Sequence, residues 1–181
     1  MYLTTPDMGA GPAVIVIPED HALCDLLATE GFTALAPQLT PGQTAEDLTA
    51  AIEFLKPHEA VRGQGIAVIG SAAGAGLALW LGTHHPDDIV AIVAVSGTVP
   101  ADGEQPDWSR LAAAVQGHFS ENDPTCPPDV IAALEQALGE AGVTVEFFTY
   151  PTAGPRFFEE DGDPARQAWI RTLEFLRKHL G

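Results

Sequence analysis

The stretch from Ile66 to Trp80 reads IAVIGSAAGAGLALW, and it decides the fold. An apolar run typical of a buried strand leads into a glycine-rich turn and then into an apolar segment typical of a helix. This order matches a nucleophile elbow, Gly-x-nucleophile-x-Gly, whose small residues allow a turn that raises one side chain above a sheet. Gly70 and Gly74 hold the outer positions, and Ala72 stands where serine or cysteine would act. A methyl group cannot attack a carbonyl, so the motif predicts the turn without its reactive group.

Hydrophobic runs separated by glycine and proline predict strands alternating with helices along the chain. Asp20 is placed to cap the first helix and Gly31 to end it. This order is typical of an α/β fold, a doubly wound and mainly parallel sheet flanked by helices, here as a single domain over residues 1–181. Ligands of such folds gather at the carboxyl ends of the strands, where the elbow lies. Besides the elbow, we expect strands over 13–17, 32–36, 89–95, 111–119 and 143–148, and helices over 19–30, 44–56, 129–142 and 164–180.

Charge and composition exclude several classes of partner. The formal net charge is −17 and no basic patch is visible, so we expect no nucleic-acid partner. No apolar run approaches the roughly 20 residues that cross a bilayer, and the start shows no signal peptide. We therefore expect a cytoplasmic protein with no membrane partner, and Cys24 and Cys126 are too few for a disulfide scaffold. Halophily or a Lys-poor, acidic proteome would explain the acidity, and the oligomeric state stays open.

Four further motifs stand in order along the chain: GFTALAP at 31–37, HPD at 85–87, GHF at 117–119 before Asp123-Pro124, and YPTAG at 150–154. Each alone is weak, but together with the elbow they are fairly specific. From about Ala13 to Leu180, the chain resembles the dienelactone hydrolase family of the α/β-hydrolase superfamily. The resemblance implies a minimal α/β-hydrolase fold. It also implies a triad of cysteine or serine, aspartate and histidine that acts on esters or lactones.

Carried over onto this chain, the triad falls on Ala72, Asp123 and Pro155, so only the acid keeps its residue type. The only histidine after Asp123 is His179, near the end of the last predicted helix. The loop from Pro18 to about Asp20 is short, and the family takes one backbone N–H of its oxyanion hole from this loop. Nucleophile, base and part of the oxyanion hole therefore depart from the pattern together.

The leading hypothesis is a dienelactone-hydrolase-like protein that does not hydrolyse and that binds a small ligand or a partner in the pocket at the elbow. Asp123 is the remaining catalytic position, and without a histidine it needs another donor, for which Arg156 is the candidate. No cofactor and no metal are expected, because the His and Cys residues lack zinc-type spacing. The residues expected to bind the ligand are Ala72, Ala73, Glu19, His21 and Arg156.

Two alternatives stay open. One is an enzyme with altered chemistry, a hydrolase, lyase or isomerase, in which Asp123 is the acid–base residue and His21 or Cys24 assists. His21, Cys24 and Asp25 share one helix face, which would suit a Cys–His pair or a metal, although packing is the simpler interpretation. The other alternative is a structural or assembly protein with a filled pocket. The aromatic candidates to fill it are Trp108, Phe157 and Phe158.

Three polar residues near the motifs are interpreted as structural. Ser71 precedes the apex, lacks glycines at its own flanks and has no visible base, so we expect its hydroxyl to satisfy backbone groups of the turn. Cys126 and His118 lie in apolar surroundings and are expected in the core. The turn-rich stretch 97–110 is a candidate rim of the pocket.

Overall fold

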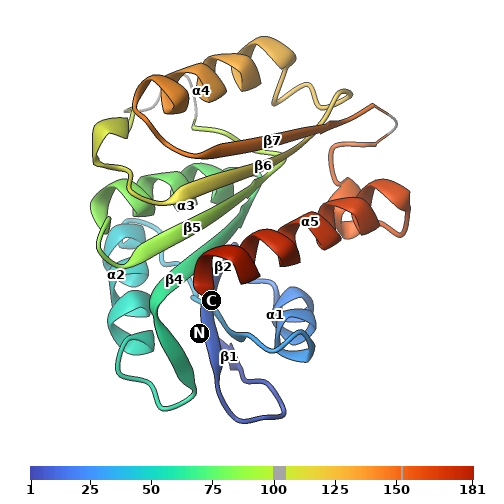
Figure 1. Ribbon diagram of the computed structural model, residues 1–181. Coiled ribbons are helices and arrows are strands. Elements are labelled where there is room, and N and C mark those ends of the chain that lie inside the picture. The colour runs from blue at the N-terminus through green and yellow to red at the C-terminus, as the bar shows by residue number, and fades with distance from the viewer. Residues whose placement is uncertain (100–104, 152) are drawn as a thin grey trace.

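The computed structural model describes residues 1–99, 105–151 and 153–181. In these residues a seven-stranded sheet has the order β1-β3-β2-β4-β5-β6-β7, with helices on both faces (Figure 1). Neighbouring strands pair in parallel except β1, which is antiparallel to β3. The strands are β1 (Tyr2–Thr4), β2 (Gly11–Ile17), β3 (Thr33–Ala36), β4 (Val61–Ser71), β5 (Ile89–Val95), β6 (Ala114–Ser120) and β7 (Val145–Tyr150). The helices are α1 (His21–Thr29), α2 (Thr44–Leu55), α3 (Ala73–His84), α4 (Pro128–Glu140) and α5 (Asp163–Leu180), with 3-10 turns η1 (Trp108–Arg110) and η2 (Phe157–Glu159).

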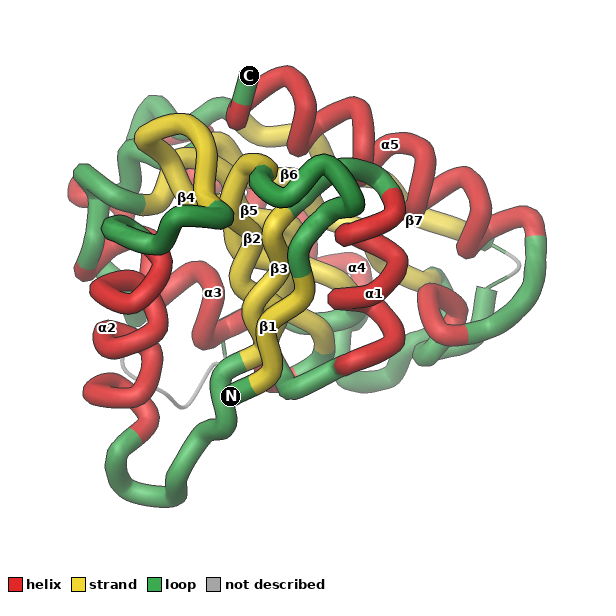
Figure 2. The backbone as a smooth tube through the Cα atoms, turned by 90° about the horizontal axis from the view of Figure 1, so that it is seen from below, coloured by secondary structure: helices red, strands yellow, loops and turns green. Residues whose placement is uncertain are grey.

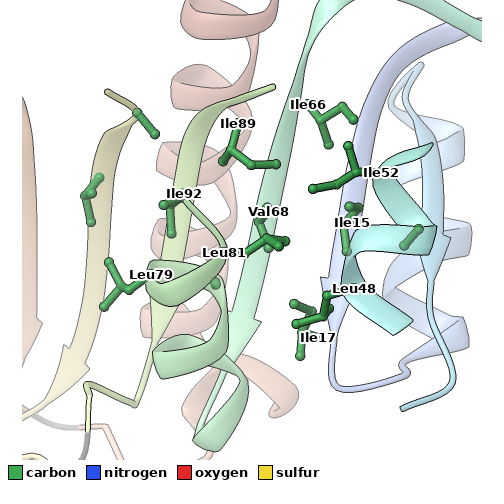
Figure 3. Close-up of a cluster of buried hydrophobic side chains, with 14 of the residues drawn as sticks. Ile15, Ile17, Leu48, Ile52, Ile66, Val68, Leu79, Leu81, Ile89 and Ile92 are labelled. Atoms are coloured by element: carbon green, nitrogen blue, oxygen red, sulfur yellow. The ribbon is translucent and has the colours of Figure 1, made fainter. Parts of the chain in front are cut away.

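Each face of the sheet has its own hydrophobic core, and Figure 2 shows the sheet between the two groups of helices. On one face α2, α3 and α4 contribute Leu48, Leu79 and Leu134, part of which Figure 3 shows. On the other face α1 and α5 contribute Leu27 and Phe175. The central strands are covered on both sides, which explains why they read as continuous apolar runs. The predicted α/β class, with a mainly parallel sheet flanked by helices, is confirmed.

Capping residues set the boundaries of α1, the helix beside the elbow. Asp20 caps it, since the Asp20 carboxylate accepts a hydrogen bond from the backbone N–H of Leu23 at 3.0 Å. Gly31 follows the helix with a φ of 97°, which glycine adopts without steric cost. Only Pro18–Asp20 separates β2 from α1, as the sequence indicated. Both predicted boundary residues are confirmed.

Some strand boundaries differ from the prediction. β1 was not expected, because three residues give too short a pattern and the strand lies at the edge of the sheet. β4 begins at Val61 rather than Ile66, since two glycines at 63 and 65 make its start read as a turn. β6 begins at Ala114, three residues later than expected. Among the described residues, no helix combines the length and the hydrophobicity that crossing a membrane requires.

Candidate functional site

The elbow forms as the sequence predicted. β4 ends at Ser71, α3 begins at Ala73, and Ala72 between them has φ 49° and ψ −121°, a conformation that side chains rarely adopt. The surrounding glycines are required by close backbone approaches. A Cβ at Gly74 would overlap the carbonyl oxygen of Ile17, and a Cβ at Gly97 would overlap that of Ala72 itself. The strained turn is therefore built into the packing between the ends of β2, β4 and β5.

The elbow opens into a cavity of about 320 Å³ at the carboxyl ends of these strands. Ala72, Asp123 and Pro155, the three triad positions implied by the resemblance, all line it. They come together because each follows the carboxyl end of a strand: β4, β6 and β7. The apolar walls include Val16, Ile17, Leu23, Ile69, Val95 and Phe158, and the charged residues at the cavity are Asp20, Asp123, Arg156 and Glu159.

Asp123 takes its hydrogen bonds from a residue two positions on. Its Oδ1 accepts the backbone N–H of Thr125 at 2.8 Å and the Thr125 hydroxyl at 2.6 Å, and the residue is 4% exposed. The expected pairing with Arg156 is wrong, because Arg156 is exposed and forms no ion pair with Asp123 in the described residues. The turn at Thr125 supplies the hydrogen-bond donors that we expected from Arg156. The other carboxylate oxygen of Asp123, Oδ2, has no hydrogen-bond partner among the described residues.

The expected ligand-binding residues divide into two groups. Ala72 and Arg156 line the cavity, whereas Ala73, Glu19 and His21 do not. His21 is turned to the surface, where its ring stacks on Tyr2 with centroids 3.9 Å apart and its Nε2 pairs with the Glu19 carboxylate at 2.9 Å. Within the loop Pro18–Asp20, the residues that line the cavity are Pro18 and Asp20.

Cys24 belongs to the core and is not placed for covalent chemistry. It is fully buried in the core on the face of the sheet that α1 and α5 cover. Burial raises the pKa of its thiol to about 12, with the carboxylates of Asp20, Asp25 and Glu19 adding to the rise. Asp25 accepts a hydrogen bond from the Tyr2 hydroxyl at 2.8 Å. The face that His21, Cys24 and Asp25 share on α1 therefore forms no joint site, and packing is the role that the structure gives to Cys24.

None of the six histidines, all of which are described, lines the cavity. His118 is a satisfied core residue, as expected: its Nδ1 bonds the Tyr150 hydroxyl and its Nε2 the side-chain oxygen of Gln116, both at 2.9 Å. Burial, with the nearby charge of Arg171, lowers the pKa of His118 to about 3. His179 packs on Phe175 along α5, away from the elbow.

Two serines line the cavity beside Ala72, and neither has an imidazole partner. The backbone of Ser71 pairs with β5, but its hydroxyl has no hydrogen-bond partner in the described residues, so its expected role of satisfying backbone groups of the turn is wrong. Ser96 was not singled out from the sequence. It follows β5 with a φ of 47°, and its buried hydroxyl has no partner within the described part of the chain. The dipeptide Ser96-Gly97 after a strand was the available signal for an unusual backbone there.

The pocket is not filled by the aromatic candidates. Trp108 packs against the core on the α3 side, and Phe157 is buried beside Tyr150 with ring centroids 4.9 Å apart. Phe158 lines the cavity but leaves it open. Cys126 packs with Phe119 and its neighbours, as expected. Residues 100–104 of the candidate rim 97–110 lie outside the described residues. Nowhere in the described part of the chain do acidic, His or Cys side chains form a cluster that could hold a metal.

Comparisons with known proteins identify the family. Residues 40–180 match the model of the "Dienelactone hydrolase family". A Yersinia pestis protein named "Putative carboxymethylenebutenolidase" is 27% identical, covering 98% of this chain and 83% of its own length. A Bradyrhizobium protein named "Probable 2-oxo-3-(5-oxofuran-2-ylidene)propanoate lactonase" is 26% identical, covering 99% and 89%.

Solved structures show the same fold. The protein titled "m3DLH" superimposes with a TM-score of 0.80 at 21% identity, covering 99% of this chain and 92% of its own.

The alignment with the Yersinia relative runs over 222 residues, more than the 181 present here, so that relative carries insertions that this chain lacks. The chain has an α/β-hydrolase fold and belongs to the dienelactone hydrolase family.

Proposed function

We propose that this chain is a non-hydrolytic member of the family that binds a small molecule in the cavity at the elbow. The observation that carries the proposal is the alanine at the apex of a fully formed elbow. The strained turn that presents a nucleophile is kept, and the atom that would attack is absent. Losing the nucleophile of a triad lowers turnover by around 10⁶-fold.

The other parts of the triad support the same conclusion. Pro155 occupies the histidine position, and no imidazole reaches the cavity that could activate Ser71 or Ser96. Asp123 is held by Thr125 rather than by a base. The three-residue loop after β2 begins with Pro18, which has no backbone N–H to offer an oxyanion. The nucleophile and the base are thus both replaced at one site, and the loop after β2 is short.

The open cavity favours a binding role over the alternatives. A structural protein with a filled pocket would leave no such volume beside Ala72, whereas about 320 Å³ lies there with largely apolar walls. Altered chemistry by Asp123 with His21 or Cys24 needs those side chains at the cavity, and both lie elsewhere. Binding without hydrolysis therefore agrees best with the site.

Hydrolysis of a p-nitrophenyl ester tests the proposal. We expect the native chain to hydrolyse the ester no faster than buffer does. The single variants Ser71→Ala, Ser96→Ala and Asp123→Asn should show the same rate. The double variant Ala72→Cys with Pro155→His restores both missing groups. We expect it to hydrolyse the ester about 100-fold faster than buffer does, at the low end of the acceleration that a positioned base gives. Native turnover that disappears in one of the single variants would contradict the proposal.

A further inference from the structure

A second cavity, of about 590 Å³, adjoins the first. The two share four lining residues, Asp20, Leu23, Phe158 and Glu159. The second cavity lies between α1 and the first half of α5, with η2 and the segment after it at one side, and Figure 2 shows these two helices on the same side of the sheet. The two cavities are therefore neighbours, and the four shared residues lie between the elbow and the space between α1 and α5.

Carboxylates dominate the charge of these two cavities. Asp20, Asp123, Glu159, Glu160 and Asp161 line one or both of them. The cations there are two arginines. One of these, Arg166, is already paired with Asp163, so its charge is offset. The other, Arg156, shares the elbow cavity with three carboxylates and is outnumbered there.

Aromatic and aliphatic side chains form the surface between these charges. Phe158 lies at both cavities and Trp169 at the second, with ring centroids 6.4 Å apart at 69°. Leu23 and Leu26 of α1 also line the second cavity. The faces of Trp and Phe rings attract cations, most strongly where carboxylates stand nearby and water is partly excluded.

We infer that the ligand is an organic cation with an apolar body, an ammonium or guanidinium group attached to an aromatic or aliphatic portion. The inference rests on the proposed binding function and adds the chemical class of the ligand. The apolar portion contacts Val16, Ile69 and Phe158, and the cationic group lies between the Phe158–Trp169 pair and the carboxylates of Asp20 and Glu159. An anion of the same shape would meet those carboxylates unfavourably.

Three probes with the same phenylpropyl body test the inference: 3-phenylpropylammonium, 3-phenylpropanol and 3-phenylpropionate. Each is titrated into the full-length protein, and amide chemical shifts report both the affinity and the location. We expect the ammonium to bind at least tenfold more tightly than the alcohol, and the carboxylate to bind more weakly than the alcohol. The largest shifts are expected at residues of the two cavities.

A matched pair of double variants separates a local effect from the attraction of a highly negative protein. Asp20→Asn with Glu159→Gln removes two carboxylates from the cavities, and asparagine keeps the cap of α1. Glu53→Gln with Glu135→Gln removes two exposed carboxylates from α2 and α4. The first pair is expected to reduce the preference for ammonium over alcohol at least fivefold, and the second to leave it unchanged.

The outcomes separate this inference from the proposed function. Alcohol or carboxylate binding as tightly as the ammonium would overturn the cation assignment while leaving a binding site at the elbow. An equal loss in both double variants, shifts centred outside the two cavities, or no binding by any probe at 10 mM would also overturn it. The non-hydrolytic role is tested separately: ester hydrolysis by the native chain would contradict it whatever the three probes show.

Discussion

Ala72 keeps a backbone conformation that enzymes of this fold use to present a nucleophile. With φ 49° and ψ −121°, it lies in a region where only glycine is unstrained, at a cost of order 1–3 kcal/mol for other residues. In a hydrolase that strain positions the reactive atom. Here the side chain is a methyl group, so relieving the strain removes nothing that the proposed function uses.

Replacing Ala72 with glycine should therefore stabilise the protein. The relief of strain outweighs the greater freedom of glycine in the unfolded chain, and we expect the free energy of unfolding to rise by about 1 kcal/mol. Urea denaturation measures the change. Ala132→Gly, at an exposed position within α4, is the matched control and should lower the same quantity by about 1 kcal/mol. Losses of similar size in both variants would show that Ala72 is not strained.

At the level of whole elements, the elbow depends on a close backbone contact between α3 and the end of β2. A Cβ at Gly74 would overlap the backbone at Ile17, and backbone cannot move as a side chain can. We expect Gly74→Ala to lower the free energy of unfolding by more than about 2 kcal/mol, as overpacking in cores does. Gly139→Ala in α4 meets no atom within 4 Å and should raise it by about 0.5–1 kcal/mol. Tolerance of alanine at 74 would mean that α3 and β2 are not in this close contact.

A buried polar cluster joins β6, β7 and α5. His118 bonds Tyr150 and Gln116, lies 3.2 Å from the Thr172 hydroxyl, and Arg171 stacks over Phe148 nearby. Because its pKa falls from the ordinary 6.5 to about 3, folding favours the neutral ring. Its contribution to stability is therefore complete above pH 6.5 and is lost as the pH falls toward 3, since the unfolded chain takes up the proton first.

His118→Gln should expose this dependence. We expect the variant to be less stable than the native chain at pH 7.5, and the difference between the two to shrink by about 2 kcal/mol at pH 5. Comparing the two proteins at each pH cancels the titration of the many carboxylates. Denaturant unfolding at the two pH values gives the answer, and a difference that stays constant would mean that His118 is not held neutral.

The whole molecule carries a net charge of −17 with its histidines neutral, and the four ion pairs of lysine and arginine in the described residues all lie at or near the surface. Exposed pairs of this kind add little stability. Repulsion among the remaining carboxylates therefore destabilises the folded state, and added salt should screen it.

Raising NaCl from 20 to 500 mM should increase the free energy of unfolding by about 1 kcal/mol or more at pH 7.5. At pH 4.5, where part of the negative charge is neutralised, the same addition should have a smaller effect. Thermal and urea unfolding at both pH values measure this. Stability that falls with salt at pH 7.5 would contradict the account of the charge.

The architecture was predictable because strands buried on both faces leave long apolar runs, and because the elbow has a pattern of small residues at fixed spacing. Ala72, Asp123 and Pro155 could be brought together in advance, since residues after parallel strands meet at one edge of the sheet. The edge strand β1 and the start of β4 were missed because short or glycine-interrupted strands carry little periodicity.

The details of the site were less predictable, for a physical reason. The partner of Asp123 is Thr125, in a local Asx-type turn that the Asp-x-Thr pattern of the sequence could have predicted. The expected pairing with Arg156 depended on the path of a loop, which the sequence does not define. The second cavity depends on how η2 and α5 pack against α1, segments more than 100 residues apart along the chain. Contacts of that range leave no periodic signal.

Reaction with a p-nitrophenyl alkylphosphonate, followed by intact mass and peptide mapping, tests whether this site holds a nucleophile at all. Such reagents form stable adducts with activated serine hydroxyls. The native chain should remain unmodified at Ser71 and Ser96, while Ala72→Ser with Pro155→His should gain one adduct at position 72. A stoichiometric adduct on either serine of the native chain would show that the elbow still carries a working nucleophile.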